Sequence, residues 1–211
     1  MASIYYPIKK INNSSKPLRK VEKKSLNKDV HSKLGMRLEE DINITNKYYL
    51  NHDIAVIYKK PTPIKIVRVS YLKRSAAKIT EAYFKDPSTT DYNGIYKGKY
   101  IDFEAKECNN ATSFPFSSIH KHQINHLENV IKHGAIAFII LKMVKHNEVY
   151  LIKAQDFIKY YSKHERKSLP YSWIKENGYL IDNSRYTRPC DYIEQINEAF
   201  SKEISLWTRN I

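Results

Sequence analysis

Two carboxylates and a lysine share a short segment in which single apolar residues separate them. A strand through Asp102, Glu104 and Lys106 would place all three side chains on one face and leave the apolar residues to bury on the other. A tight turn at Lys97-Gly98 would return Asp91 to their side. Carboxylate oxygens suit Mg²⁺, and a lysine beside them can steady a water or the charge that develops on phosphorus. The pattern favours a metal-dependent phosphodiesterase centre; the alternative is an exposed strand face with ordinary charges.

The charge of the chain predicts a polyanionic partner. Its 211 residues carry 36 Lys and Arg against 22 Asp and Glu, a formal net charge of +14, which favours DNA, RNA or an anionic membrane surface. No apolar stretch approaches the roughly 20 residues that span a bilayer. The N-terminus has no apolar signal core, and the two cysteines form no metal-binding motif. We therefore expect a cytoplasmic protein without a membrane partner, and the lack of a Gly-rich phosphate loop argues against an NTPase.

Two basic segments flank the beginning of the expected core. Residues 1–33 hold nine Lys and Arg against two acids and predict a flexible arm, either ordered on DNA or merely solvated, before a domain at 34–211. Residues 54–80 contain seven Lys and Arg and no acid. We expect a protruding stalk at about 60–81 that probes DNA, with a lysine-protected edge strand as the alternative. The candidate DNA-binding residues are Lys59, Lys60, Lys65, Arg68, Lys73, Arg74 and Lys78.

The hydrophobic periodicity predicts an α/β protein. Helices are expected at 31–50, 120–133, 154–163 and 193–207, and strands at 54–58, 64–72, 99–107, 135–144 and 148–152. Residues 73–83 fit either a short helix or an extended segment. This order of elements implies a mixed central sheet flanked by helices.

Other residues could take part in chemistry. His122 and His126 have the i, i+4 spacing of zinc ligands on a helix, but Gln123 stands where a zinc-protease motif has Glu, so DNA-facing or surface histidines are favoured. Gln123 could orient a water near the scissile phosphate or be a plain polar helix residue. Glu39 or Glu40 could reach a metal site if their helix packs against the hairpin; a solvated acid is the favoured alternative. A tyrosine nucleophile stays open among 17 tyrosines, but it would leave the carboxylates unexplained.

The sequence resembles the RecU family of Holliday-junction resolvases over about residues 34–195. The matching stretches are Leu38-Glu-Glu-Asp-Ile-Asn43, Thr45-Asn-Lys-Tyr-Tyr49, Lys59-Lys-Pro-Thr-Pro-Ile64, Lys73-Arg-Ser-Ala-Ala77, Glu81-Ala-Tyr-Phe84, Ser88-Thr-Thr-Asp-Tyr-Asn-Gly-Ile-Tyr-Lys-Gly98, Tyr100-Ile-Asp-Phe-Glu-Ala-Lys-Glu107, Thr112-Ser-Phe-Pro115, His122-Gln123, Arg166-Lys-Ser168 and Asp191-Tyr192. Three positions depart from the usual pattern of the family, namely Leu34 in the place of an arginine, Cys108 in the place of a threonine and Cys190 in the place of an isoleucine. With Leu34 in place of the arginine, the chain lacks the arginine that could contact DNA at this position.

The resemblance implies a fold similar to type II restriction endonucleases of the PD-(D/E)xK type, a homodimer and symmetric nicking of four-way DNA junctions. It implies Mg²⁺ as the cofactor, with Mn²⁺ as the alternative, and a stalk that enters the junction centre. The recombinase and branch-migration proteins are candidate partners. The implied catalytic and metal-site residues are Asp91, Asp102 and Glu104 as metal ligands, Lys106 beside the attacking water, Glu39 as a helix carboxylate that completes the site, and Thr89, Thr90 and Gln123 as close supporting residues. A non-catalytic junction-binding module and a restriction-type nuclease for linear duplex are the alternative functions.

Overall fold

The computed structural model of the protein describes residues 26–71, 73–84, 89–163 and 165–208. Residues 1–25 of the predicted flexible arm (1–33) lie outside the described ranges. Residues 26–33 belong to the first helix, α1 (Leu26–Asn51), which begins five residues before the expected start at residue 31. No helix among the described residues is long and apolar enough to cross a membrane.

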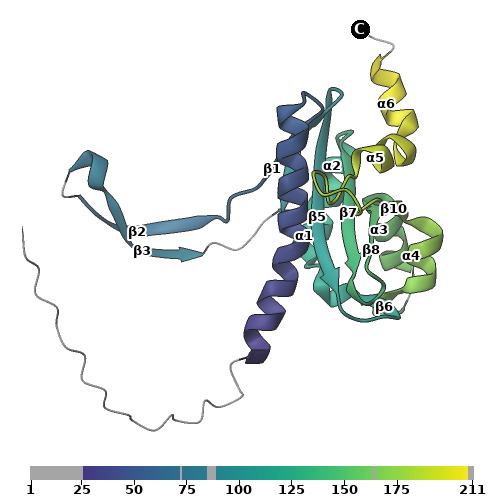
Figure 1. Ribbon diagram of the computed structural model, residues 1–211, viewed down its shortest axis with the longest axis horizontal. Coiled ribbons are helices and arrows are strands. Elements are labelled where there is room, and N and C mark those ends of the chain that lie inside the picture. The colour runs from purple at the N-terminus through teal and green to yellow at the C-terminus, as the bar shows by residue number, and fades with distance from the viewer. Residues whose placement is uncertain (1–25, 72, 85–88, 164, 209–211) are drawn as a thin grey trace, which may run out of the picture.

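A six-stranded mixed sheet forms the centre of the molecule, as predicted (Figure 1). Its strands are, in spatial order, β1 (Val56–Lys59), β4 (Tyr92–Tyr96), β5 (Lys99–Cys108), β7 (Ile136–Met143), β8 (Glu148–Lys153) and β10 (Tyr179–Ile181). Neighbouring strands are antiparallel except β5 and β7, which are parallel. The connection between these two contains a helix, because parallel neighbours need a long crossover.

Helices cover both faces of the sheet and divide the core in two. One face packs against α1, α5 (Ile193–Ala199) and α6 (Ser201–Thr208). The other packs against α2 (Lys121–Lys132), α3 (Ala154–Lys163) and α4 (Tyr171–Asn177). Short strands β6 (Ser113–Pro115) and β9 (Ser168–Pro170) pair beside this second layer. Because both faces of the sheet are covered, successive residues of a strand can be buried even though they point to opposite faces.

The expected single helix at 193–207 is wrong, since the structure has two helices there. The chain bends at Phe200, whose ring is buried and lies 6.4 Å from the ring of Phe138. Ile196 and Ile204, four residues before and after Phe200, belong to the same core cluster.

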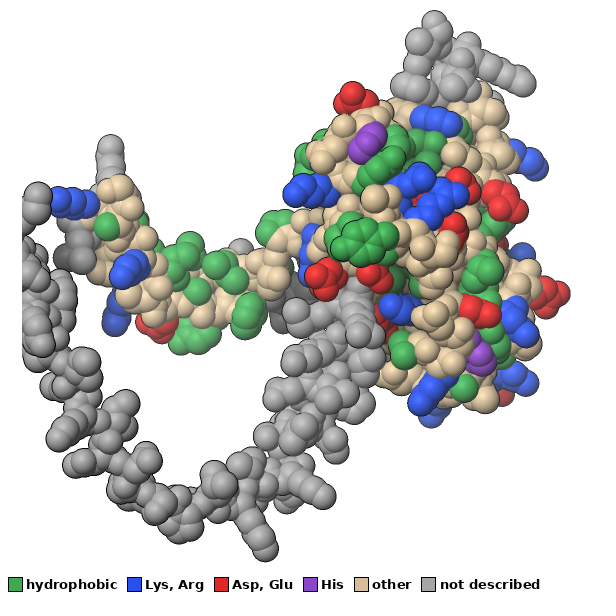
Figure 2. Space-filling model, viewed as in Figure 1, with side chains coloured by type: hydrophobic (Ala, Val, Ile, Leu, Met, Phe, Trp, Pro, Cys, Tyr) green, Lys and Arg blue, Asp and Glu red, His purple; other side chains and the backbone are tan. Residues whose placement is uncertain are grey.

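A two-stranded hairpin follows β1 and extends away from the central sheet (Figure 1). It consists of β2 (Ile64–Ser70), a 3-10 turn at Arg74–Ala76 and β3 (Lys78–Phe84), so residues 73–83 combine both expected conformations. Nearly every described side chain on it is exposed. Figure 2 shows Lys and Arg side chains beside an apolar surface on this hairpin.

The pairing of β1 with β4 depends on a glycine. Gly94 lies opposite Ile57, and a Cβ atom at Gly94 would overlap the carbonyl oxygen of Val56 and lie 2.5 Å from Ile57 Cα. These are backbone atoms, so they cannot move aside without separating the strands.

We therefore expect Gly94→Ala to lower the free energy of unfolding by about 3 kcal/mol through overpacking, as measured by urea denaturation. Gly134→Ala is the matched control. Its backbone φ is positive, at 84°, but an added Cβ meets no atom within 4 Å, so only the conformational cost of about 1 kcal/mol applies. Equal losses for the two variants would contradict close strand packing at Gly94.

Candidate active site

Strand β5 separates an apolar face from a charged face, as its sequence predicts. Ile101, Phe103 and Ala105 belong to the core beneath α1. Asp102 and Glu104 point to the opposite face, toward α2, and are fully buried. The charged side chains of the strand are therefore held inside the protein rather than in solvent.

A stack of aromatic rings holds β5 in place on the face of the sheet that packs against α1. The Phe103 ring lies between those of Tyr92 on β4 and Phe138 on β7, with centroid separations of 4.8 and 4.7 Å. Such cross-strand pairs stabilise a sheet and its register. Because Phe103 lies between Asp102 and Glu104 in sequence, this stack also fixes where the two carboxylates emerge.

Asp102 accepts hydrogen bonds from several elements. Lys60 Nζ lies 2.8 Å and Tyr100 Oη 2.9 Å from Asp102 Oδ2, and the His126 ring nitrogen is 3.1 Å from the same atom. The Thr90 hydroxyl donates to Oδ1. Burial would raise the pKa of Asp102, but the bonds from Lys60, Thr90 and His126 together lower it below its usual value. Asp102 is therefore a carboxylate over the whole neutral range.

Glu104 has the opposite electrostatic balance. Its Oε1 lies 2.5 Å from Lys106 Nζ and accepts a hydrogen bond of 2.7 Å from Gln123 Nε2. Burial and the neighbouring Asp91 carboxylate raise the pKa of Glu104 to about 7, although Lys106 opposes the shift. The site thus joins one stable carboxylate to a second that gains or loses a proton near neutral pH.

Asp91 returns beside this pair at the start of β4, as the hairpin pattern predicts. Its backbone N–H donates to Glu104 Oε2 at 3.2 Å, and its Oδ2 accepts from the backbone N–H of Ala105 at 3.3 Å. Its carbonyl oxygen accepts from the Lys60 backbone N–H at 2.7 Å. The polypeptide backbone therefore holds Asp91 against β5 and ties the base of the β2–β3 hairpin to it.

Among the supporting residues implied by the resemblance, Thr90 and Gln123 contact the carboxylates directly. Gln123 also accepts, through Oε1, a hydrogen bond of 3.0 Å from the backbone N–H of His120. That bond closes the start of α2 and aims the amide nitrogen at Glu104. Thr89 differs, since its hydroxyl lies 3.5 Å from the carbonyl of Thr90.

Glu39 and two of the predicted DNA-binding lysines form ion pairs within the protein. Glu39 Oε2 on α1 lies 2.5 Å from Lys59 Nζ, with both side chains partly exposed. Its role in completing the site stays a prediction. Lys59 and Lys60, which were expected to contact DNA, form ion pairs with Glu39 and Asp102. Their contact with DNA stays a prediction. Lys65, Arg68, Lys73 and Lys78 are exposed on the hairpin, and the Arg74 side chain is outside the described part.

The sequence did not reveal that Tyr100, His126 and Lys60 contact Asp102. Tyr100 could have been found, because it precedes Asp102 by two residues and therefore shares its face of the strand. His126 follows Gln123 by one helical turn, which places it beside the next carboxylate along β5. The position of Lys60 depends on how β1 pairs with β4, which no local pattern specifies.

The donor chemistry fits a hard divalent cation, since carboxylate oxygen atoms from Asp91, Asp102 and Glu104 gather on one face. In the described part of the chain, however, no three His, Cys, Asp or Glu side chains are arranged to hold a metal ion. Ammonium groups and hydrogen-bond donors occupy the carboxylate oxygens. The zinc alternative also receives no support, because His126 is directed to Asp102.

A mixed sheet covered by helices, with buried carboxylates paired to lysines, is the arrangement of a candidate phosphodiesterase. The model of the family "Recombination protein U", RecU, matches residues 33–198. The chain therefore belongs to the RecU family. It is 50% identical over 188 residues to the Holliday junction resolvase RecU of Geobacillus sp. (strain WCH70), covering 85% of this chain and 93% of the relative.

Further similarities involve a second relative and one solved structure. The Holliday junction resolvase RecU of Bacillus cytotoxicus is 46% identical over 202 residues, which cover 94% of this chain and 98% of the relative. The crystal structure of Hjc, a Holliday junction resolvase from Archaeoglobus fulgidus, aligns at 13% identity and a TM-score of 0.42, covering 69% of this chain and 95% of that one.

The raised pKa of Glu104 predicts a pH-dependent stability in metal-free buffer. An acid whose pKa is higher in the folded state stabilises the fold at low pH and loses that contribution as the pH rises through the folded value. Relative to Glu104→Gln, the wild type should lose on the order of 2 kcal/mol between pH 5 and pH 8, as measured by urea unfolding in EDTA.

Asp102→Asn provides the matched control. The pKa of Asp102 is lowered, so this residue ionises below pH 5 in both the folded and unfolded states. Its substitution should change stability by the same amount at pH 5 and pH 8. A Glu104→Gln effect that is equally independent of pH would contradict the raised pKa.

Proposed function

We propose that this protein is a metal-dependent endonuclease that resolves four-way DNA junctions by symmetric nicking, in homologous recombination and DNA repair. The observation that carries the proposal is the group of Asp91, Asp102 and Glu104 on one face of the β4–β5 hairpin with Lys60 and Lys106 against it. Membership of the RecU family supports it, as do two relatives named Holliday junction resolvases. We further propose a fold of the restriction-endonuclease type, with the β2–β3 hairpin as its stalk.

The proposed reaction is hydrolysis of a backbone phosphodiester. A water oxygen bonds to phosphorus on the side opposite the leaving oxygen and gives up one proton to the solvent, while the bond from phosphorus to the leaving oxygen breaks and that oxygen takes up a proton. Lys106 is placed to orient the water or to stabilise charge on the phosphate, while Gln123 orients Glu104. A divalent cation, Mg²⁺ or alternatively Mn²⁺, held by the three carboxylates with Thr89 and Gln123 nearby, would lower the pKa of a water and neutralise phosphate charge.

The substrate class follows from shape and charge. Two symmetric nicks need two sites, so we propose a homodimer whose two-fold axis matches that of the junction. The hairpin would enter the junction centre, with Lys65, Arg68, Lys73 and Lys78 against phosphates. The recombinase and branch-migration proteins remain candidate partners.

Asp102→Asn should strongly slow junction cleavage while retaining binding. The substitution removes the charge of one of the three clustered carboxylates, so we expect a loss of about 10²- to 10³-fold in rate, the range found for removal of one key electrostatic group in other enzymes. The measurement is single-turnover cleavage of a synthetic four-way junction and of matched linear duplex with Mg²⁺, followed by ligation of the products.

Asp156→Asn, on the distant helix α3, is the matched control and should cleave at the wild-type rate. Nicking of the linear duplex as fast as the junction would instead indicate a restriction-type nuclease. Junction binding without cleavage by the wild type, with Mg²⁺ or Mn²⁺, would indicate a non-catalytic binding module.

Charge removal on the hairpin should weaken the salt dependence of junction binding. Each phosphate contact contributes about −0.9 to the slope of log affinity against log salt concentration. A variant with Lys65, Arg68, Lys73 and Lys78 changed to Gln should therefore have a slope reduced by about 2 to 4, as measured by fluorescence anisotropy.

The matched control removes the same charge from the helices, by changing Lys159, Lys163, Lys175 and Lys202 to Gln. All four are exposed on α3, α4 and α6. This variant should retain the wild-type slope. The same reduction in both variants would mean that net charge, rather than the hairpin, determines binding.

A further inference from the structure

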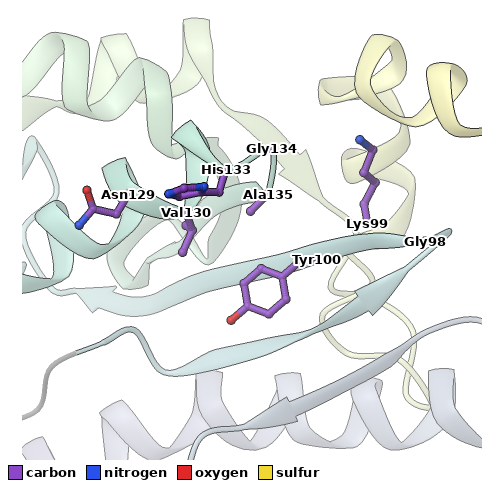
Figure 3. A pocket seen from close by; sticks show the side chains of 8 residues that line it. All are labelled: Gly98, Lys99, Tyr100, Asn129, Val130, His133, Gly134 and Ala135. Carbon is purple, nitrogen blue, oxygen red and sulfur yellow. The ribbon is translucent and has the colours of Figure 1, made fainter.

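A cavity opens beside the candidate active site, between the beginning of β5 and the end of α2. Its volume is about 530 Å³, within the usual range for small-ligand sites. In Figure 3, Asn129 on α2 and His133, which directly follows this helix, lie across from Tyr100 on β5, while Lys99 points away from them. The proposed reaction gives this cavity no role.

The cavity continues the line of contacts between α2 and β5. Gln123 contacts Glu104 and His126 contacts Asp102, and one helical turn further on Asn129 and Val130 share the cavity with Tyr100. Strand side chains on one face recur every second residue, about 7 Å apart. The cavity is therefore one step along the strand from Asp102, on the same face.

Tyr100 joins the cavity to the active site. Its ring lines the cavity and is 40% exposed, while its hydroxyl donates to Asp102 Oδ2 at 2.9 Å and accepts from Asn93 Nδ2 at 3.1 Å. The hydroxyl is thus held between two partners, and the ring presents a fixed surface. A flat group packed against this ring would lie next to the catalytic carboxylate.

The walls combine groups that bind nucleobases. Aromatic rings stack on bases of any sequence, and Tyr100 and His133 supply two such rings. An Asn amide can pair with a base edge, most favourably with adenine, and the exposed Asn129 supplies that amide. No Asp or Glu lines the cavity, so nothing there repels a polyanionic strand.

We propose that this cavity binds the nucleobase adjacent to the cleaved phosphate, with Asn129 reading its edge and Tyr100 supporting its ring. The proposal rests on the proposed junction cleavage and adds a source of sequence preference to it. When a junction is held open, the bases at the branch point lose a stacking neighbour, so their displacement into a pocket then costs less than in intact duplex.

The test compares cleavage rates on four-way junctions that differ only in the base pairs flanking the cleaved phosphate. Wild type should prefer some sequences, and Asn129→Ala should reduce that preference by about ten-fold, within the range known for loss of one amide–base contact. Asn125→Ala, one turn earlier on α2 and outside the cavity lining, should retain the wild-type preference. An unchanged preference in Asn129→Ala, or equal cleavage of all sequences by wild type, would overturn the proposal.

A second readout separates this proposal from junction cleavage itself. Junctions with 5-iodouracil next to the branch point would be cross-linked to the protein in EDTA, and the attached peptides identified by mass spectrometry. Attachment at Tyr100 or within residues 129–135 supports the base site even if no cleavage occurs with any metal. Attachment only elsewhere overturns it even if cleavage is normal.

Discussion

The structure depends on the neutralisation of carboxylates that the central sheet buries. Asp102 and Glu104 are fully buried, and an unpaired charge in such a place would cost several kcal/mol. Lys60 and Lys106 lie within 2.8 and 2.5 Å of them and make the arrangement tolerable. Under the proposed function, a divalent cation that entered the site would take over the interactions that the ammonium groups now provide. Binding of the metal and of phosphate would then be linked, since a displaced lysine could contact the DNA backbone.

Glu104 shows how the neutralisation is only partial. Its pKa is raised to about 7 because Asp91 is close and because Lys106 compensates for burial incompletely. Asp102 has four hydrogen-bonding neighbours, and three of them, Lys60, Thr90 and His126, overcome the effect of burial on its pKa. Two carboxylates two residues apart thus differ because their neighbours come from different elements.

The sequence predicted those parts of the fold and site that local patterns determine. The alternation of β5 placed Asp102, Glu104 and Lys106 on one face, and the turn at Lys97-Gly98 returned Asp91 to them. Short elements such as β10 and α4 were missed because three to seven residues contain too few periods to be recognised. The partners of Lys59 and Lys60 could not be predicted, because they depend on tertiary pairing. The resemblance supplied Glu39, whose observed partner is Lys59.

Lys59 and Lys60 also show that the length and register of the edge strand β1 are strictly constrained. As consecutive residues they point to opposite faces, Lys59 to Glu39 on α1 and Lys60 to Asp102. Insertion or deletion of one residue in β1 would exchange the two faces and remove both counter-ions at once. The β2–β3 hairpin beyond it has no such constraint, since its side chains are exposed. Variation in length during evolution should therefore be tolerated within the hairpin and excluded from the few residues that lead into it.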